Sequence, residues 1–259
     1  MEGRLGCRSK KYMSFTISGG FINGKKYMGV TISGGFINHV RFLYDLGLQE
    51  ALSEKGVRYG INAHTSYGLP AYILAAASVE AFFNEVFMQP ISWMLNRLPP
   101  LNVSEEWLEK VEIGPKILIV PQLLVGRSLM RNEQPYQDLA LLIKVRNDLI
   151  HYKMSSTPPK YLADLTQRRI ILAYLGGKEG KPDFLWPHKL ECTEGIRWAH
   201  NTACAVVEAL VGLLDANQRG LGMSTDANFS SIPESVARDW FTSHNIDPNS
   251  NYPQVSTEA

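Results

Sequence analysis

Residues 146–151 hold three side chains whose chemistry suits a phosphate ester: Arg146, Asn147 and His151. Arginine presents a planar fork of N–H donors that can grip a phosphate, and histidine can gain or lose a proton near neutral pH. The amide of Asn147 can hydrogen-bond either group. Together these residue types could hold a phosphodiester and move the protons of its cleavage without a metal ion.

The segment that carries them is predicted to be an amphipathic helix. Pro135 suits the first position of a helix, and residues 136–153 follow it with helical spacing of apolar side chains. On a helical wheel the apolar stripe of this segment consists of Leu139, Leu142, Ile143, Leu149 and Ile150. Arg146 falls in the middle of that stripe, where a charge is costly unless it is paired or faces a polar cavity.

The spacing within the motif limits what one helix can do. Asn147 and His151 are four residues apart and therefore share a face. Arg146 and His151 are five residues apart, roughly 140° around the helix axis. Both can reach one phosphate only if the arginine bends around the helix or if a second copy of the helix supplies the complementary group.

An upstream helix carries a similar charge on an apolar face. Residues 71–89 have helical periodicity, and their apolar stripe consists of Ile73, Ala76, Ala77, Phe83 and Phe87. Glu80 and Asn84 lie on the same stripe. A carboxylate and a guanidinium set in two apolar faces are expected to meet as a buried bidentate pair. Such a pair could make Arg146 a satisfied core residue, or Glu80 could orient Arg146 for binding.

The string Arg146-Asn147-x-x-x-His151 resembles the R-x4-6-H signature of the HEPN (higher eukaryotes and prokaryotes nucleotide-binding) superfamily, in the form with a polar residue after the arginine. The surrounding LALLIKVRNDLIHYK is similar to its signature helix, and the upstream AAASVEAFFNEVF resembles its first long helix. The resemblance covers roughly residues 69–216. It departs from the members that carry a tyrosine two residues after the histidine, because Lys153 takes that place here.

The resemblance implies an all-α, up-and-down helical bundle that dimerises by apposing the two signature helices, so that both motifs line one cleft. Catalytic members are metal-independent endoribonucleases that leave a 2′,3′-cyclic phosphate and a 5′-hydroxyl. By this resemblance His151 is the general base or the general acid, and Arg146 holds the scissile phosphate. Asn147 would bind the phosphate or fix the imidazole.

The resemblance also suggests roles for neighbouring residues and partners. Glu80 and Asn84 would support the catalytic side chains from behind, and Tyr152 and Lys153 would contact the substrate. The expected partners are RNA, a second copy of the chain through the motif helix and, in a toxin or defence role, an antitoxin protein. No cofactor, metal ion or membrane is expected.

Two alternatives to a nuclease stay open. The first is a catalytically inactive HEPN module that binds RNA or nucleotide, or that only mediates dimerisation. The second is a helical structural protein in which Arg146 pairs with Glu80 and His151 has no role.

The chain divides into three expected segments: a tandem repeat over residues 1–40, the helical domain over residues 41–217, and a polar, largely disordered tail over residues 218–259. The repeat consists of KKYMSFTISGGFIN and KKYMGVTISGGFIN. Each copy has a β-leaning stretch followed by Gly-Gly, which predicts a short hairpin-like structure. Within the tail, only residues 233–242 look able to form a short helix.

The composition indicates a soluble, cytoplasmic protein. The chain has 259 residues with 45% hydrophobic and 20% charged residues, a net charge of +1 and three cysteines. An odd number of cysteines without paired spacing argues against a disulfide framework. No stretch of about 18 uninterrupted apolar residues is present, as a membrane span would need.

Two His–Cys pairs invite a metal interpretation, but ordinary helix packing explains them better. His188 with Cys192 and His200 with Cys204 each have a spacing of four residues. On one helix the two pairs would be about 18 Å apart, so they cannot share one ion. His64 is expected in a loop without a catalytic role.

Overall fold

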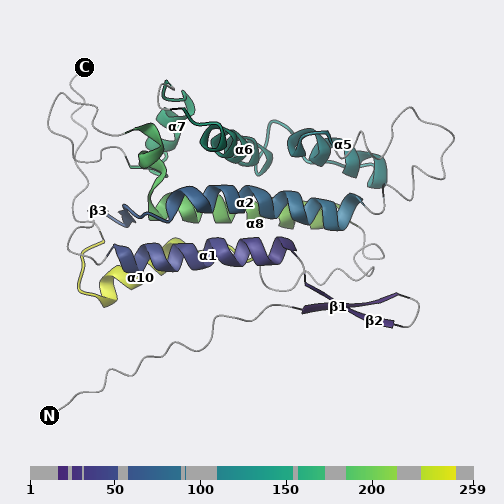
Figure 1. Ribbon diagram of the computed structural model, residues 1–259, viewed down its shortest axis with the longest axis horizontal. Helices are drawn as coiled ribbons and strands as arrows, with labels where there is room; N and C mark the ends of the chain where they lie inside the picture. Colours follow the sequence, from purple (N-terminus) through teal and green to yellow (C-terminus); the bar gives the residue numbers. More distant parts are fainter. Residues whose placement is uncertain are drawn as a thin grey trace, which may run out of the picture.

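Two long helices, α2 (Gly68–Phe83) and α8 (Thr193–Leu213), form the central layer of the computed structural model (Figure 1). α1 (Ile32–Glu50) packs on both from one side. The described part of the chain is mostly helical, which confirms the predicted all-α class. The structure describes residues 17–22, 25–30, 32–51, 58–88, 91, 110–153, 157–172, 185–214 and 229–248.

The opposite side of the central layer is covered by three shorter helices. They are α5 (Ile113–Val125), α6 (Tyr136–Ile150) and α7 (Tyr161–Gln167). In Figure 1 they form the outer layer above α2 and α8. A short 3-10 helix, η2 (Trp186–Leu190), leads into α8, and the two-residue strands β3 (Arg58–Tyr59) and β4 (Asn62–Ala63) pair at the same end of the bundle.

α2 is buried on most of its circumference because it lies between α1, α6 and α8. A π-helical turn, η1 (Asn84–Met88), continues it, and the Phe83 and Phe87 rings stack 5.0 Å apart. α2 with η1 is long and apolar enough to cross a membrane by length and composition, which the sequence interpretation did not anticipate. A core helix meets the same criterion, and half of the apolar window is buried inside the bundle.

The two copies of the N-terminal repeat differ in structure. β1 (Ile17–Ile22) and β2 (Lys25–Val30) pair antiparallel, so the second half of copy one pairs with the first half of copy two. The sequence ISGGFI forms β1 in copy one, but the same six residues form the first turns of α1 in copy two. The expected hairpin in each copy is therefore wrong for the second copy, and the expected boundary at residue 40 falls inside α1.

The carboxylate of Glu85 on η1 caps the first residues of α1. Oε1 of Glu85 accepts hydrogen bonds from the backbone N–H groups of Ile32 (2.7 Å) and Ser33 (3.2 Å). Oε2 accepts the Ser33 hydroxyl at 2.5 Å. These bonds satisfy N–H groups that a helix start leaves without intrahelical partners, and a negative charge suits that end of a helix.

The C-terminal segment contains α10 (Glu234–Ser243), close to the helix predicted over residues 233–242. Residues 229–248 of the expected tail pack on the bundle, since Ile232, Ala237 and Phe241 are buried. Asn201 of α8 holds this segment by donating to the Ile232 carbonyl (2.9 Å) and accepting from its N–H (2.7 Å).

Candidate functional site

The motif lies at the C-terminal end of α6, but the helix is turned relative to its expected orientation. Leu139, Leu142 and Val145 are the buried residues of α6, while Ile150 is 51% exposed. Val145 rather than Arg146 thus continues the buried face. Arg146 lies at the edge of that face, with a side chain 27% exposed.

Arg146 and Glu80 do approach each other, but not as the buried bidentate pair expected from the sequence. Among the described residues their contact joins Nη2 of Arg146 to Oε2 of Glu80 at 3.8 Å, and the Glu80 side chain is 44% exposed. The face of α2 that carries Glu80 and Asn84 is its accessible one, with Ile73 also 36% exposed. Arg146 is therefore not a neutralised core arginine, and its guanidinium retains donors for another anion.

Asn147, which is half-buried, and His151, which is exposed, lie on the same face of α6. His151 caps the helix, its backbone N–H donates to the Asn147 carbonyl at 3.0 Å, and the residue is exposed. The carboxamide of Asn147 forms no hydrogen bond within the described part of the chain. An exposed imidazole and an uncommitted amide four residues apart can both contact one ligand at this surface.

The remaining predicted site residues occupy different surroundings. The Tyr152 ring is partly buried and packs edge-on against Trp186 of η2, with ring centroids 5.6 Å apart. Lys153 is exposed beside it. Asn84 is exposed at the end of α2, where its backbone N–H continues the helix. The structure thus brings Arg146 and Glu80 together and puts Tyr152 into packing rather than at the outer face.

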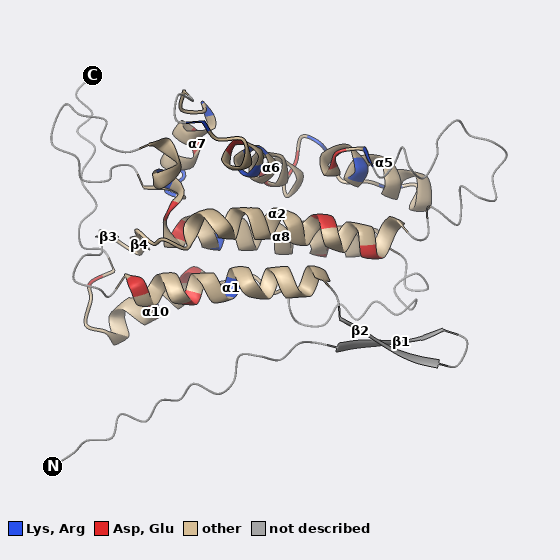
Figure 2. Cartoon of the chain, viewed as in Figure 1, with Lys and Arg blue, Asp and Glu red and all other residues tan. Residues whose placement is uncertain are grey.

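Positively charged side chains are concentrated on the side of the molecule that carries the motif (Figure 2). Figure 2 shows lysine and arginine mainly on the outer layer of α5, α6 and α7. Arg168 in this layer is already paired, 2.9 Å from Asp138 and 3.6 Å from Asp164. The layer carrying Arg146 is accordingly the one best suited to meet a polyanion.

No protein-family model, curated protein or solved structure matches this chain. A family assignment therefore rests on the residues of the motif and their placement on α6.

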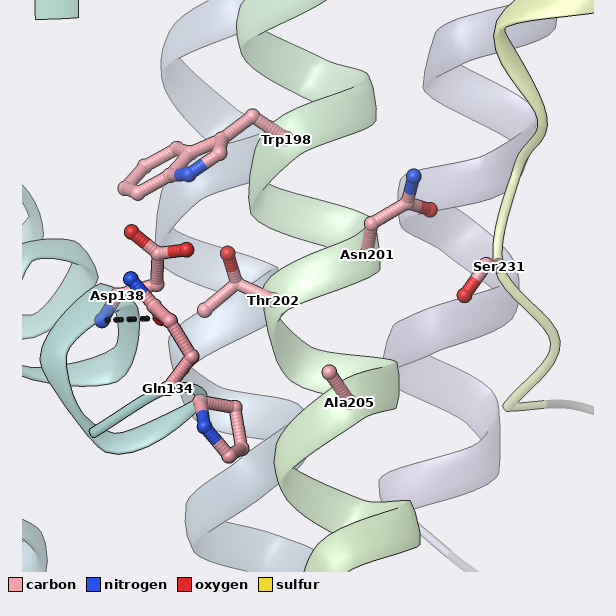
Figure 3. A pocket seen from close by; sticks show the side chains of 8 residues that line it. Gln134, Asp138, Trp198, Asn201, Thr202, Ala205 and Ser231 are labelled. Carbon is pink, nitrogen blue, oxygen red and sulfur yellow. Dashed lines mark hydrogen bonds between the residues drawn. The ribbon is translucent and has the colours of Figure 1, made fainter.

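A pocket of about 300 Å³ lies at the other end of α6, between the start of that helix, α8 and the segment before α10 (Figure 3). Asp138 and Trp198 line it together with Gln134 and Thr202. Asp138 and His151 are 13 residues apart in sequence, or about 20 Å along a helix. The pocket is separate from the motif.

A second polar cluster, which the sequence interpretation missed, lies where β4, η2 and α8 meet. Oε2 of Glu191 is 2.6 Å from Nδ1 of His188 and 3.4 Å from Nε2 of His64. Burial raises the pKa of Glu191, but the hydrogen bonds from the two histidines outweigh it and hold that pKa below its usual value. His64 and His188 are 124 residues apart in sequence, so no spacing could have indicated this cluster.

The two His–Cys pairs do not form metal edges in the structure. His188 turns to Glu191, and Cys192 is buried with its thiol directed at the Ile170 carbonyl. His200 is fully buried with Nδ1 3.6 Å from the Cys204 sulfur. Among the described residues no group of three histidine, cysteine or acidic side chains is arranged to hold a metal ion.

Proposed function

We propose that this chain is a metal-independent endoribonuclease of the HEPN type, acting as a homodimer in which two α6 helices meet. The observation that carries the proposal is the state of the motif. Within the part of the chain that the structure describes, Arg146 makes a long contact of 3.8 Å with a half-exposed carboxylate, and His151 is exposed one helical turn from Asn147. The ion pair of Glu194 and Arg197 elsewhere in the bundle is the contrast, because its atoms are 2.6 Å apart and its carboxylate is only 8% exposed.

The proposed reaction uses the residues as their chemistry allows. Arg146 binds a non-bridging oxygen of the scissile phosphate and stabilises the charge that develops on it. His151 exchanges a proton with the reacting oxygens, and Asn147 holds the phosphate or the imidazole. The 2′-oxygen forms a bond to phosphorus, the bond to the 5′-oxygen breaks, and a 2′,3′-cyclic phosphate and a 5′-hydroxyl result.

The exposed apolar surface of α6 supports the homodimer. Ile150 lies about 60° around the helix from Asn147 and is 51% exposed. A second α6 packed there would cover Ile150, and it would bring the Arg146 of one chain towards the His151 of the other. This arrangement would overcome the roughly 140° separation of the two side chains on a single helix.

The test of catalysis is an RNA cleavage assay in EDTA with wild type, His151→Ala and the control Lys144→Ala, an exposed residue of the same helix. We expect cleavage by wild type and the control but not by His151→Ala, with cyclic-phosphate ends on the products and equal thermal melts. Equal cleavage by all three proteins would place the activity elsewhere. RNA binding without cleavage by wild type would favour the inactive HEPN module instead.

The test of the homodimer is the molar mass in solution of wild type, Ile150→Glu and the control Ile119→Glu. Ile119 lies on α5 and is 40% exposed, so it offers a matched exposed isoleucine. We expect Ile150→Glu to be monomeric and inactive and Ile119→Glu to behave as wild type. A monomeric wild type, or a dimer indifferent to Ile150→Glu, would rule out this interface.

The biological setting follows from the same proposal. An RNase of this kind would act on cytoplasmic RNA in a toxin or defence role, with an antitoxin protein as its regulator. Expression of wild type is then expected to arrest growth, and expression of His151→Ala is not.

A further inference from the structure

The cluster around Glu191 contains two half-exposed imidazoles held by one carboxylate. The side chains of His64 and His188 are 37% and 40% exposed, whereas that of Glu191 is 15% exposed. A carboxylate hydrogen-bonded to one ring nitrogen of a histidine orients the ring for proton transfer at the other nitrogen. The cluster therefore has the parts of a proton donor, and the motif on α6 does not use it.

This cluster is connected to the motif through an aromatic contact. Tyr152 directly follows His151, and its ring packs on Trp186, the first residue of η2. His188 lies two residues further along η2, and each residue of a 3-10 helix advances it by only about 2 Å. The end of α6 that carries His151 and the short helix that carries His188 thus pack against each other.

RNA cleavage by the 2′-oxygen needs two proton transfers. One group takes the proton from the 2′-hydroxyl as its oxygen attacks phosphorus, and another gives a proton to the 5′-oxygen as its bond to phosphorus breaks. Where the Arg146 of one chain meets the His151 of the other in the proposed dimer, the motif residues supply a single imidazole, because neither a guanidinium nor an amide serves as a proton-transfer group.

We infer that His188, oriented by Glu191, is the second proton-transfer group of the reaction. This inference rests on the proposed nuclease function. His151 is the base and ends the step protonated; the His188 imidazolium is the acid and ends it neutral, so the proton count balances and exchange with water restores both. His188 rather than His64 takes this role because its contact with Glu191 is shorter, 2.6 Å against 3.4 Å, and because it lies on the helix that contacts Tyr152.

The test compares two substrates that differ in whether the leaving group must be protonated as it departs. RNA has an alkoxide leaving group that must be protonated, whereas a nucleoside 3′-phosphate ester of 4-nitrophenol has a leaving group that departs without a proton. For His188→Ala we expect RNA cleavage to fall by about 10²- to 10⁴-fold and cleavage of the nitrophenyl ester to stay within about threefold of wild type. His151→Ala should lose activity on both substrates, and the control His64→Ala on neither.

The dependence of kcat/KM on pH supplies a readout that a structural role of His188 would not change. Wild type is expected to give a bell-shaped profile with RNA, and His188→Ala should lose the alkaline limb. His188→Gln serves in place of the alanine variant if the latter does not melt as wild type does. RNA cleavage that depends on His151 but is unaffected by His188→Ala overturns this inference alone, whereas a wild type that cleaves neither substrate overturns the proposed function with it.

Discussion

Replacing Arg146 with methionine separates a structural role of this residue from a role in binding phosphate. Methionine keeps an unbranched apolar side chain and removes the guanidinium, so packing changes little. The lost ion pair has its atoms 3.8 Å apart and side chains that are 27% and 44% exposed. An exposed pair contributes about 0.2–1 kcal/mol, whereas breaking a buried one costs roughly 3–5 kcal/mol. We therefore expect Arg146→Met to lower the free energy of unfolding by less than about 1 kcal/mol.

The assay is a double-mutant cycle of wild type, Arg146→Met, Glu80→Gln and the double variant, unfolded by urea. The coupling energy should be below about 1 kcal/mol, and at this chain length the melting temperature should fall by no more than about 2–4 °C. The same proteins are assayed for RNA cleavage, which Arg146→Met should reduce by about 10²- to 10³-fold. A coupling energy near 3 kcal/mol, with cleavage falling only in proportion to the folded fraction, would contradict a phosphate-binding role and make Arg146 a packing residue.

Three further substitutions test the caps and the core packing of the helical bundle. Glu85→Ala should destabilise the protein by about 1 kcal/mol in urea unfolding, because α1 loses its capping carboxylate, and no change would mean that the cap is replaced by solvent. Burial lowers the pKa of His200 from 6.5 to about 4. The neutral ring therefore stabilises the fold fully above pH 6.5, and roughly 3 kcal/mol of the free energy of unfolding is lost as the pH falls towards 4. Curves of stability against pH for His200→Gln should lack this dependence. Asn201→Ala leaves the N–H and C=O of Ile232 unpaired, which should cost about 2–3 kcal/mol and speed amide hydrogen exchange in α10, whereas unchanged exchange would show that other contacts hold the segment.

Periodicity predicts that α2, α6 and α8 are helices but not which side of each faces the core. A helical wheel assumes one buried side, and α6 carries apolar residues on two. Ile143 and Ile150 follow one line and Val145 another, and the packing of α6 onto α2 and α8 selects Val145. That choice moves Arg146 from the centre of a buried face to its edge. The availability of Arg146 for binding an anion depends on this rotation of α6, which only the tertiary packing determines.

The N-terminal repeat shows that one identical peptide can take two structures, depending on the residues around it. The peptide ISGGFI occurs twice, and it forms a strand over residues 17–22 but the start of a helix over residues 32–37. What differs is the continuation: copy two runs into HVRFLYDL, which places Val40 and Tyr44 in the core, whereas copy one runs into GKKYMGVT. The burial of later turns and the cap from Glu85 outweigh the weak local preference of a peptide with two adjacent glycines.

A motif within one helix can be found in a sequence, whereas a site assembled from distant segments cannot. Arg146, Asn147 and His151 can be found because one helix sets their spacing, so the string itself carries the signal. A second proton donor has no such constraint, since any element that packs against the end of α6 can supply it. His188 reaches that position through Trp186 and is oriented by Glu191, whose other histidine comes from a distant part of the chain. If the chemistry of this protein needs two imidazoles, the one outside the motif is the one that only the three-dimensional structure could reveal.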